Sequence, residues 1–255
     1  MRIATWNINS IRAREERALG WTAANQPDIL CLQEIKIEDA EFPTLSFRGL
    51  GYEAAVHGQR TYNGVAILSK LPIADVVRGF GDGGDESHSR FIAATVGGIR
   101  LYNVYVPNGQ APGTDKYAFK IEWMARLGRY LRAHAGDGPA LLLGDINVAP
   151  ADMDVHDPVA WKEQIMCTSV ERAALARIVE PGWTDTLRAI HPDLKVFTWW
   201  DYRQLSFPKG KGLRIDHIFA TAPVAARVRD VKVDREARKG KQPSDHAPVI
   251  AELAS

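Results

Sequence analysis

Short apolar segments with the residue composition of β-strands recur along this chain, and they constrain its fold more than any other feature. Asp28–Leu32 and Ala140–Leu143 are almost wholly apolar, as is typical of strands covered on both faces. Phe91–Val96 and Ile99–Val106 flank Gly97-Gly98, a pair that predicts a tight hairpin. The remaining strand-like segments are Arg2–Ile8, Gly51–His57, Gly64–Leu68, Phe197–Trp200, Ile215–Ala220 and Ala247–Leu253.

Three further segments have the periodicity of helices. Lys116–His134 is the clearest, since Phe119, Trp123 and Leu127 repeat at helical spacing with basic residues between them. The others are Ile11–Asn25, which ends before Pro27, and Val170–Val179. Antiparallel strands with helices between them predict an α/β sandwich of two sheets covered by helices. No glycine-rich phosphate loop follows a strand, which argues against a nucleotide-binding fold.

The length and composition are typical of a single soluble domain. Hydrophobic residues make up 45% of the 255 residues, enough for a substantial core. Cys31 and Cys167 cannot form a disulfide framework, and no long apolar segment of a signal peptide follows the first residues. We therefore expect one domain over residues 1–255 in a cytoplasmic protein without a membrane-spanning segment, and we further expect a monomer.

The net charge of +1 hides a basic segment towards the C-terminus. Residues 203–241 contain eleven Lys or Arg and four acidic residues, so this segment carries a net charge of +7 and the remainder −6. A basic stretch on a nearly neutral protein suits a polyanionic partner. An isolated run of charge is nevertheless more often a solvated loop, so this feature needs support from other residues.

Polar residues stand where the apolar strands begin or end. Asn7, Glu34 and Asp145 close predicted strands, while Asp216 and Asp245-His246 lie at the start of later ones. Hydrolysis of a phosphodiester requires neutralisation of the phosphate charge, and carboxylates that hold Mg²⁺ meet that need. Each residue alone is equally typical of an ordinary strand end or turn. Their joint arrangement predicts one metal-dependent phosphodiesterase site.

Asp145 and Asn147 are two residues apart, so both side chains would share a face if the strand continued through them. Asp145 would then orient or deprotonate a water, and Asn147 would donate a hydrogen bond to the phosphate. The alternative is an Asx turn after the strand. Gly144 would allow close approach of the backbone or a ligand.

We expect a different chemical role for each of the other polar side chains. His246 would serve as a general base or, when protonated, as a phosphate donor. Asp216 would orient an imidazole through its second nitrogen, whereas His217 should point the other way. Tyr105 ends a predicted strand before Pro107, where a phenol would bind phosphate or pass a proton.

These segments, in this order, resemble the exonuclease III family of DNA-repair nucleases, part of the wider endonuclease/exonuclease/phosphatase fold shared with DNase I. The motifs that carry the resemblance are Trp6–Arg12, Leu32–Lys36, Tyr105–Gly109, Gly144–Asn147, Gly212–Asp216 and Ser244–Pro248. The resemblance implies a four-layer αββα sandwich of two mostly antiparallel sheets flanked by helices. It also implies a magnesium-dependent enzyme, with manganese as a substitute, that cleaves double-stranded DNA 5′ to abasic sites. Processing of blocked 3′ ends, as a 3′–5′ exonuclease, 3′-phosphatase or 3′-phosphodiesterase, is implied as well.

The same resemblance implies roles for individual residues. The residues matched to the metal site are Asn7, Glu34, Asp145, Asn147, Asp245 and His246. Those matched to the catalytic residues are Tyr105, Asp145, Asn147, Asp216 and His246. The general base stays open between Asp145 and His246, as does the choice between one and two metal ions.

Three residues are expected to contact substrate, namely Asn108, Trp199 and Leu213. Trp199 and Leu213 would form opposite walls of an apolar pocket for a flipped sugar that lacks its base. Core packing would equally explain both residues. Further phosphate contacts are expected from the basic 203–241 segment and from Arg90, Lys116 and Lys120.

Two other classes of function remain open from the sequence. A phosphatase or lipid phosphodiesterase on the same fold would keep the polar set, but a lipid enzyme should also have a membrane-facing apolar loop. A non-catalytic nucleic-acid-binding regulator would be expected to have lost members of the acid and amide set. Every member is present in this chain.

Overall fold

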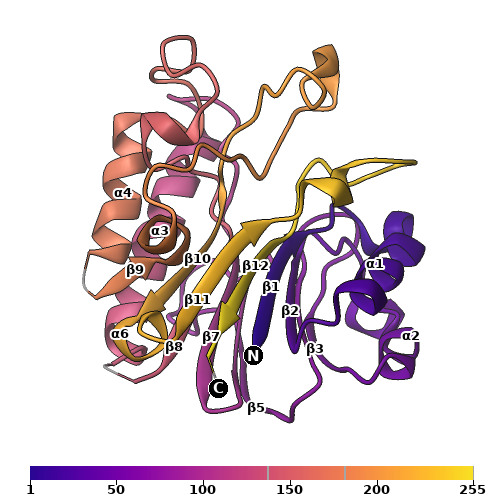
Figure 1. The fold of residues 1–255 in the computed structure, drawn as a ribbon. Helices are drawn as coiled ribbons and strands as arrows, with labels where there is room; N and C mark the ends of the chain where they lie inside the picture. Colours follow the sequence, from indigo (N-terminus) through magenta and orange to yellow (C-terminus); the bar gives the residue numbers. More distant parts are fainter. Residues whose placement is uncertain (137, 181, 255) are drawn as a thin grey trace.

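The computed structural model describes residues 1–136, 138–180 and 182–254, and its core is a pair of six-stranded sheets (Figure 1). The strands of the first sheet are β1 (Arg2–Asn7), β2 (Ile29–Gln33), β3 (Glu53–His57), β4 (Val65–Ser69), β11 (Val228–Val233) and β12 (Val249–Leu253). Those of the second are β5 (Ile73–Arg78), β6 (Phe91–Val96), β7 (Ile99–Tyr105), β8 (Ala140–Asp145), β9 (Trp183–Asp185) and β10 (Asp216–Thr221).

Each sheet is mostly antiparallel and contains one parallel pair. The first sheet has the order β11-β12-β1-β2-β4-β3, with β1 parallel to β2. The second has the order β5-β6-β7-β8-β10-β9, with β7 parallel to β8. β6 and β7 form the hairpin predicted at Gly97-Gly98, with Val96 opposite Ile99. The predicted sandwich of two mostly antiparallel sheets is therefore confirmed.

Helices cover the outer faces of both sheets (Figure 1). α1 (Ile11–Asn25) and α2 (Thr44–Gly49) lie on the first sheet, and α3 (Asp115–His134) and α4 (Ser169–Val179) lie on the second. The shorter helices are α5 (Thr186–Ile190), α6 (Ala222–Ala225) and the 3₁₀ segments η1 (Asp39–Glu41), η2 (Asp152–Asp154), η3 (Arg203–Leu205) and η4 (Arg235–Arg238). In the part of the chain that the structure describes, no helix is both long and apolar enough to cross a membrane.

The apolar core follows these layers. One cluster lies between the two sheets and includes Ile29, Ile67 and Leu141. A second packs α3 and α4 against the second sheet, where Trp123 and Leu127 of the predicted helix are buried. A third, with α1 and α2, covers the first sheet. Each fully buried large side chain contributes about 1.5–3 kcal/mol, so the three clusters hold both sheets firmly in place.

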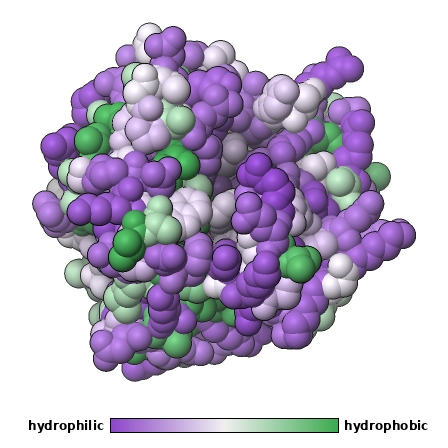
Figure 2. Space-filling view, turned by 90° about the horizontal axis from the view of Figure 1, so that it is seen from above, coloured by the Kyte–Doolittle hydropathy of each residue, from purple (hydrophilic) through white to green (hydrophobic). Residues whose placement is uncertain are grey.

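The two parallel pairs determine where the polar strand ends meet. Carboxyl ends of parallel strands lie at the same edge, so Asn7 of β1 stands beside Gln33 of β2, and Tyr105 of β7 beside Asp145 of β8. β10 runs antiparallel to β8, which places its first residue, Asp216, opposite Asp145. Seen from above, the molecule is mostly hydrophilic and hollowed near its middle (Figure 2).

Buried amides join the two sheets just below these strand ends. Asn103 of β7 donates to the carbonyl oxygens of Leu32 and Ala66 in the first sheet, at 3.0 and 2.9 Å. Gln33 Nε2 donates to Asn103 Oδ1 at 2.7 Å and to Thr5 Oγ1 at 2.9 Å. These directional bonds fix the spacing between the sheets close to where Glu34 and Tyr105 emerge.

Some strand predictions were wrong. Phe197–Trp200 is not a strand but a loop segment, in which Trp199 forms isolated bridges with Leu213 and His246. Its amides bond to two other loops, with Trp199 N to Leu213 O and Trp200 N to Asp245 O, both at 3.0 Å, so no continuous ladder forms. The strands β5, β9 and β11 were missed. β5 is largely exposed and β9 has three residues, so neither has the alternating apolar pattern that predicts a strand.

Candidate active site

Asn7 lies at the centre of the polar cluster and is fully buried. Its amide nitrogen donates to Glu34 Oε1 at 2.8 Å and to Asp145 Oδ2 at 2.9 Å. One amide thus joins a carboxylate carried by each sheet. Glu34 follows β2 in a left-handed conformation, with φ of 50°, and its carbonyl oxygen accepts the amide of Ser10 at 2.7 Å. The chain leaving β1 therefore continues to pair with the chain leaving β2, and this directs the Glu34 side chain towards the second sheet.

Asn9 and Lys36 belong to the same cluster, and the sequence interpretation missed both. Lys36 Nζ lies 2.8 Å from Glu34 Oε2 and donates to Asn9 Oδ1 at 2.6 Å. Asn9 Nδ2 in turn donates to Asp245 Oδ1 at 2.9 Å. Both residues lie inside the motif segments Trp6–Arg12 and Leu32–Lys36 that carry the family resemblance, so these motifs were the signal that could have found them. Lys36 balances part of the negative charge of Glu34.

His246 faces two carboxylates of the second sheet. Its Nδ1 lies 2.9 Å from Asp216 Oδ2, and its Nε2 lies 3.7 Å from Asp145 Oδ2. Burial alone would lower the pKa of His246, but the carboxylates of Asp216 and Asp145 outweigh it and raise the pKa to about 10. The imidazole is therefore charged at neutral pH. Asp216 orients it, as predicted, while His217 points away and contacts Val148 O at 3.1 Å.

The backbone around His246 is held by the first sheet. Ser244 Oγ donates to Asn7 O at 2.7 Å and accepts the amide of His246 at 3.1 Å. Trp6 Nε1 donates to the carbonyl oxygen of His246 at 3.2 Å. Asp216 is fixed in a similar way, because Thr198 Oγ1 accepts its amide at 3.0 Å. The Ser-Asp-His segment is thus anchored on both sides before β12 begins.

The carboxyl of Asp145 has a strongly raised pKa. Burial raises the pKa of its carboxyl to about 8, and the nearby carboxylates of Asp216 and Glu34 act in the same direction. His246 and the Asn7 amide oppose the shift. Negative charge is therefore crowded at this carboxylate, and a positive charge beside Asp145 would relieve it. Gly144 permits the approach of the strands here, since a Cβ on it would overlap the carbonyl oxygen of Val104.

Asp245 has both carboxylate oxygens occupied by protein donors. Oδ1 accepts from Asn9 and Oδ2 accepts from Trp199 Nε1 at 3.0 Å. Burial alone would raise the pKa of Asp245, but His246 and these two N–H donors lower it below its usual value. The structure therefore places Asp245 as a charged link between the β1 loop and Trp199, beside the cluster formed by Glu34 and Asp145.

Asn147 does not continue the strand, so the expectation that it shares a face with Asp145 by strand alternation was wrong. β8 ends at Asp145, and Asn147 has a left-handed backbone with φ of 53°. Its backbone N–H donates to Asp145 Oδ1 at 2.9 Å. This bond is that of an Asx turn, which was the alternative interpretation. Its side chain donates to Val106 O at 2.9 Å and accepts from Asn108 Nδ2 at 3.3 Å. The turn still keeps Asn147 next to Asp145.

Tyr105 stands at the end of β7 with its ring under a cation. The Arg90 guanidinium lies 4.5 Å from the ring centroid, and Arg90 also donates to Tyr105 O at 3.3 Å. Burial and the neighbouring Glu34 raise the pKa of the Tyr105 phenol well above its usual value. The phenol is therefore protonated at neutral pH and is a hydrogen-bond donor.

The residues expected to contact substrate have unequal access to solvent. Asn108 and Trp199 are partly exposed, whereas Leu213 is fully buried in a small apolar cluster with Val155 and Met166. Trp199 packs at the rim of that cluster, with its ring 6.5 Å from that of Trp161. The structure pairs Trp199 with Leu213, but Leu213 has no exposed surface, so the prediction that the two form opposite walls of a pocket was wrong.

Two basic residues expected to contact phosphate, Lys120 and Arg214, are buried, so the prediction was wrong for both. Lys120 is fully buried and paired with Glu171, so it does not reach the surface. Arg214, within the basic 203–241 segment, is equally buried and pairs with Asp154 at 2.6 Å and Asp185 at 2.8 Å. Charge counted along the sequence therefore overstates the basic surface. Lys116 is exposed and Arg90 is partly exposed.

Two cavities flank the polar cluster. One, of about 370 Å³, lies beside Tyr105 and is lined by Arg90, Asn108 and Lys116 among others. The second, of about 360 Å³, lies beside Trp199 and is lined by Arg203 and Lys211 among others. Basic side chains at both cavities would suit a phosphate backbone that extends on either side of the cluster.

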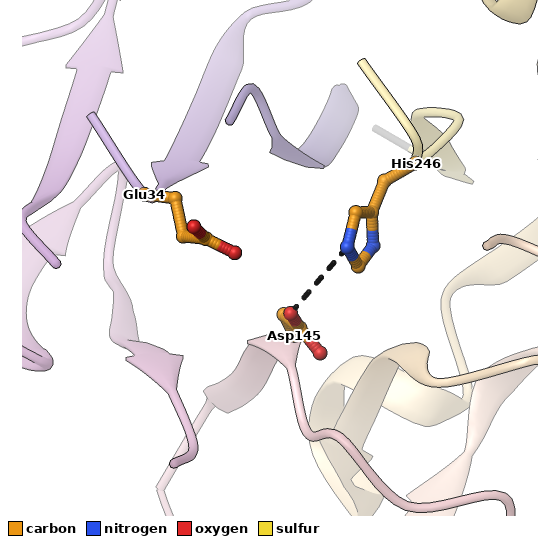
Figure 3. A group of neighbouring side chains, drawn as sticks. All are labelled: Glu34, Asp145 and His246. Carbon is orange, nitrogen blue, oxygen red and sulfur yellow. Dashed lines mark ion pairs between the residues drawn. The ribbon is translucent and has the colours of Figure 1, made fainter. Parts of the chain in front are cut away.

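Glu34, Asp145 and His246 converge from three separate segments, and one potential ligand atom of each lies within 4.8 Å of the others (Figure 3). The donors fit a hard divalent cation, because two of them are carboxylates and one of these carries crowded negative charge. His246 is the weaker candidate ligand, since it is protonated and its Nδ1 is engaged by Asp216. Asn7, between the two carboxylates, adds an amide to the same position.

Comparison with known proteins agrees with this geometry. The model of the Endonuclease/Exonuclease/phosphatase family matches residues 4–246. The chain belongs to this family. It is 34% identical to Exodeoxyribonuclease III of Haemophilus influenzae, over 99% of this chain and 100% of that protein.

Solved structures extend the family likeness to the whole chain. A 3′ phosphatase from Neisseria, bound to a product DNA hairpin, is 43% identical with a TM-score of 0.98, covering 100% of both chains. An AP endonuclease from Archaeoglobus fulgidus is 39% identical with a TM-score of 0.96, again covering 100% of both chains. The DNase I-like αββα sandwich predicted from the sequence is therefore confirmed.

Proposed function

We propose that this protein is a DNA-repair phosphodiesterase that requires Mg²⁺, or Mn²⁺ in its place, and cleaves duplex DNA 5′ to abasic sites. We further propose that it processes blocked 3′ ends as a 3′–5′ exonuclease and 3′-phosphatase. The convergence of Glu34, Asp145 and His246 at one point is the observation that carries the proposal. The names of the similar proteins, an exodeoxyribonuclease, a 3′ phosphatase and an AP endonuclease, support the choice of DNA as substrate.

Glu34 and Asp145 would hold the cation, with Asn7 between them. When bound, Mg²⁺ supplies positive charge that neutralises the phosphate oxygens. The electrostatics of Asp145 support this assignment, because the carboxylates of Asp216 and Glu34 add to the effect of burial in raising its pKa, and a divalent cation would relieve that shift. Asp245 and Asn147 also belong to the proposed site, but their side-chain oxygens are bonded to protein donors.

The charge states divide the proton chemistry between two residues. His246 is already protonated, so it is proposed to donate a hydrogen bond to a phosphate oxygen rather than to accept a proton. Asp145 is proposed to take a proton from the attacking water, because a cation beside it would offset the burial that raises its pKa and would keep its carboxylate ionised. Asp216 keeps the imidazole charged and oriented.

Three neutral donors complete the proposed phosphate site. Asn147 uses one amide hydrogen on Val106 O and retains a second for the phosphate. The Tyr105 phenol is protonated and donates beside Glu34. Asn108, at the mouth of the neighbouring cavity, adds a contact to the DNA backbone. Preorganised donors of this kind each contribute roughly 10²–10³ in rate.

Trp199 is the proposed wall of the sugar pocket, and Leu213 supports it from behind. The Trp199 indole N–H is held by Asp245, so the ring cannot swing freely. A fixed aromatic face beside a cation site would contact a flipped sugar without a base and disfavour a complete nucleotide. A non-catalytic regulator is not favoured, because the acids and amides of the cluster are present and mutually bonded.

The test uses three duplexes that carry an internal abasic analogue, a 3′-phosphate or an unmodified recessed 3′ end. Each is incubated with enzyme and Mg²⁺, and in parallel with EDTA. We expect magnesium-dependent incision on the 5′ side of the abasic analogue and release of the 3′-phosphate. The matched variants Glu34→Gln and Asp145→Asn should lose activity by about 10³-fold or more while their thermal unfolding remains cooperative. Retained turnover in both variants would refute the site, and cutting that persists in EDTA would refute the metal requirement.

A further inference from the structure

Lys120 is buried, charged and unused by the mechanism above. It lies on α3 with no exposed surface, and its Nζ pairs with the carboxylate of Glu171 on α4, which is also fully buried. An ammonium in such a position is costly unless all its donors are satisfied. A buried pair of this kind is weak evidence for stability alone, so its other contacts decide what it does.

The remaining donors of Lys120 bind the backbone of two residues of the proposed phosphate site. Nζ donates to Asn147 O at 2.7 Å and to Asn108 O at 3.2 Å. An ammonium has three N–H donors, so Glu171, Asn147 and Asn108 use all of them. The side chains of Asn147 and Asn108 also contact one another at 3.3 Å. One buried cation therefore links both loops that carry these amides.

The loops that carry Asn147 and Asn108 have backbone conformations that contacts from elsewhere in the chain must stabilise. Asn147 has a left-handed backbone, and Gly109 after Asn108 has φ of 87°. A Cβ on Gly109 would lie 3.0 Å from Lys120 Cδ, so this turn is shaped around the lysine stem. A left-handed conformation at a non-glycine residue persists only when its surroundings hold it. Lys120 supplies that hold at the Asn147 carbonyl.

Glu171 extends the same network to the loop before α4. Its carboxylate accepts the amides of Met166 and Thr168, both at 3.0 Å, in addition to Lys120. Met166 O in turn accepts the amide of Ala149 at 2.8 Å, two residues after Asn147. The pair thus fixes the chain on both sides of the Asn147 turn.

We propose that Lys120, held by Glu171, is a positioning residue that acts through Asn147 and keeps its side-chain amide aimed at the scissile phosphate. The proposal rests on the proposed function of Asn147 as a phosphate donor. Lys120 does not touch substrate. Its removal should impair the chemical step more than substrate binding, because misplaced donors lose transition-state contacts first.

A double-mutant cycle on the full-length enzyme tests this proposal. Steady-state cleavage of the abasic duplex with Mg²⁺ is measured for Lys120→Met, Asn147→Ala and the double variant. We expect Lys120→Met to lower kcat by about 10-fold or more with KM changed less than about 3-fold. In the Asn147→Ala background, the same substitution should lower kcat by less than about 3-fold, because its target is already gone.

Arg126 provides a matched control on the same helix. It is also buried, and it pairs with the more exposed Asp82 at 2.6 Å and Glu86 at 2.9 Å, neither of which belongs to the proposed site. Arg126→Met should lower the thermal unfolding temperature and leave kcat unchanged. If Lys120→Met does not fold, the cycle is run on the charge-free pair Lys120→Met with Glu171→Gln, which leaves no unpaired buried charge.

The outcomes separate this proposal from the proposed function. The positioning role would be overturned if the kcat losses of the two single variants multiplied in the double variant, or if Lys120→Met left kcat unchanged. In either case, cleavage by the wild-type enzyme would still support the proposed function. Full activity in Asn147→Ala would overturn the positioning role as well, since Lys120 would have no target. A wild-type enzyme inactive on all three duplexes would overturn both.

Discussion

His246 sits between two carboxylates whose effects on it are chemically different. Asp216 contacts Nδ1 directly at 2.9 Å, whereas Asp145 lies 3.7 Å from Nε2. The closer contact fixes the orientation of the ring, and both charges keep it protonated. The opposite nitrogen is left to face the cluster. At the scale of single residues, the two acids therefore differ in their contacts with the ring, since Asp216 orients it and Asp145 is the acid proposed to react.

Removal of the orienting charge should be visible in the pH dependence. Burial lowers the pKa of His246, and Asp216 is the main group that raises it to about 10. In Asp216→Asn the pKa should fall, so His246 would lose its proton at lower pH. We expect the alkaline limb of the kcat profile to move to lower pH and kcat at neutral pH to drop about 10–100-fold. An alkaline limb that stays in place would show that His246 is not the group that must be protonated.

Trp199 allows two of the proposed activities, abasic-site incision and 3′-phosphate release, to be separated. Its ring is held through Asp245, so Trp199→Phe keeps an aromatic face but loses that bond, and Trp199→Ala loses both. If the ring forms the sugar pocket, Trp199→Ala should lower incision at the abasic analogue by about 10-fold or more, with a smaller effect on release of a 3′-phosphate. Trp199→Phe should lie between wild type and Trp199→Ala. Equal losses on both substrates would assign Trp199 to general support of the site.

At the scale of secondary structure, the predictable part of the site was the part carried by regular strands. Glu34, Asp145 and Asp216 each adjoin an apolar run, and such a run leaves few places for a polar side chain except its end. The strand ends could therefore be predicted before any register was known. The helix Lys116–His134 was predicted for the same reason, because its apolar face repeats.

The parts of the site that could not be predicted from the sequence lie mostly in loops. Asn147 turns into a left-handed conformation in which its carbonyl oxygen accepts from Lys120 and its side chain donates to Val106 O, and these partners are 27 and 41 residues away. Phe197–Trp200 has strand-like composition, but its partners are single residues of two loops. Lys120 resembled a surface cation until its position on the buried face of α3 was known. Long-range contacts decided each case, and local propensity does not contain them.

The side-chain amides of Gln33 and Asn103, which join the two sheets, should contribute cooperatively to the free energy of unfolding. Asn103→Leu removes the bonds to Leu32 O and Ala66 O and takes away one of the acceptors of Gln33 Nε2. An orphaned buried polar group costs roughly 1–3 kcal/mol of unfolding free energy. We expect Gln33→Leu with Asn103→Leu to cost less than the sum of the two single changes, as measured by urea unfolding. Strict additivity would show that the two amides do not act as a unit.

For the molecule as a whole, the sandwich explains why the site is assembled from distant parts of the sequence. Each sheet contributes one parallel pair, and the ends of both pairs meet at the same edge of the sandwich. The first sheet brings Asn7 and Glu34, and the second brings Tyr105, Asp145 and Asp216. Displacement of one sheet against the other would separate the carboxylates. Activity should therefore be lost with, and not before, global unfolding.

Global stability should depend on pH through a histidine outside the site. His217 is fully buried beside Arg214, and burial lowers its pKa from 6.5 to about 4, with Arg214 acting in the same direction. The native state therefore resists protonation that the unfolded chain accepts. The stabilisation is complete above pH 6.5 and is lost as the pH falls towards 4, which amounts to about 3 kcal/mol.

The histidines and acids of the site also titrate, so the prediction concerns a difference between two proteins. In His217→Gln this contribution is absent, while His246 and Asp145 are unchanged. The gap in unfolding free energy between wild type and His217→Gln, measured in urea at pH 7.5, 6, 5 and 4.5, should narrow steadily as the pH falls. The direction follows from the sign of the shift, because only the wild-type unfolded state gains a proton at His217 in this range. A gap that stays constant over this range would mean that His217 is protonated in the native protein.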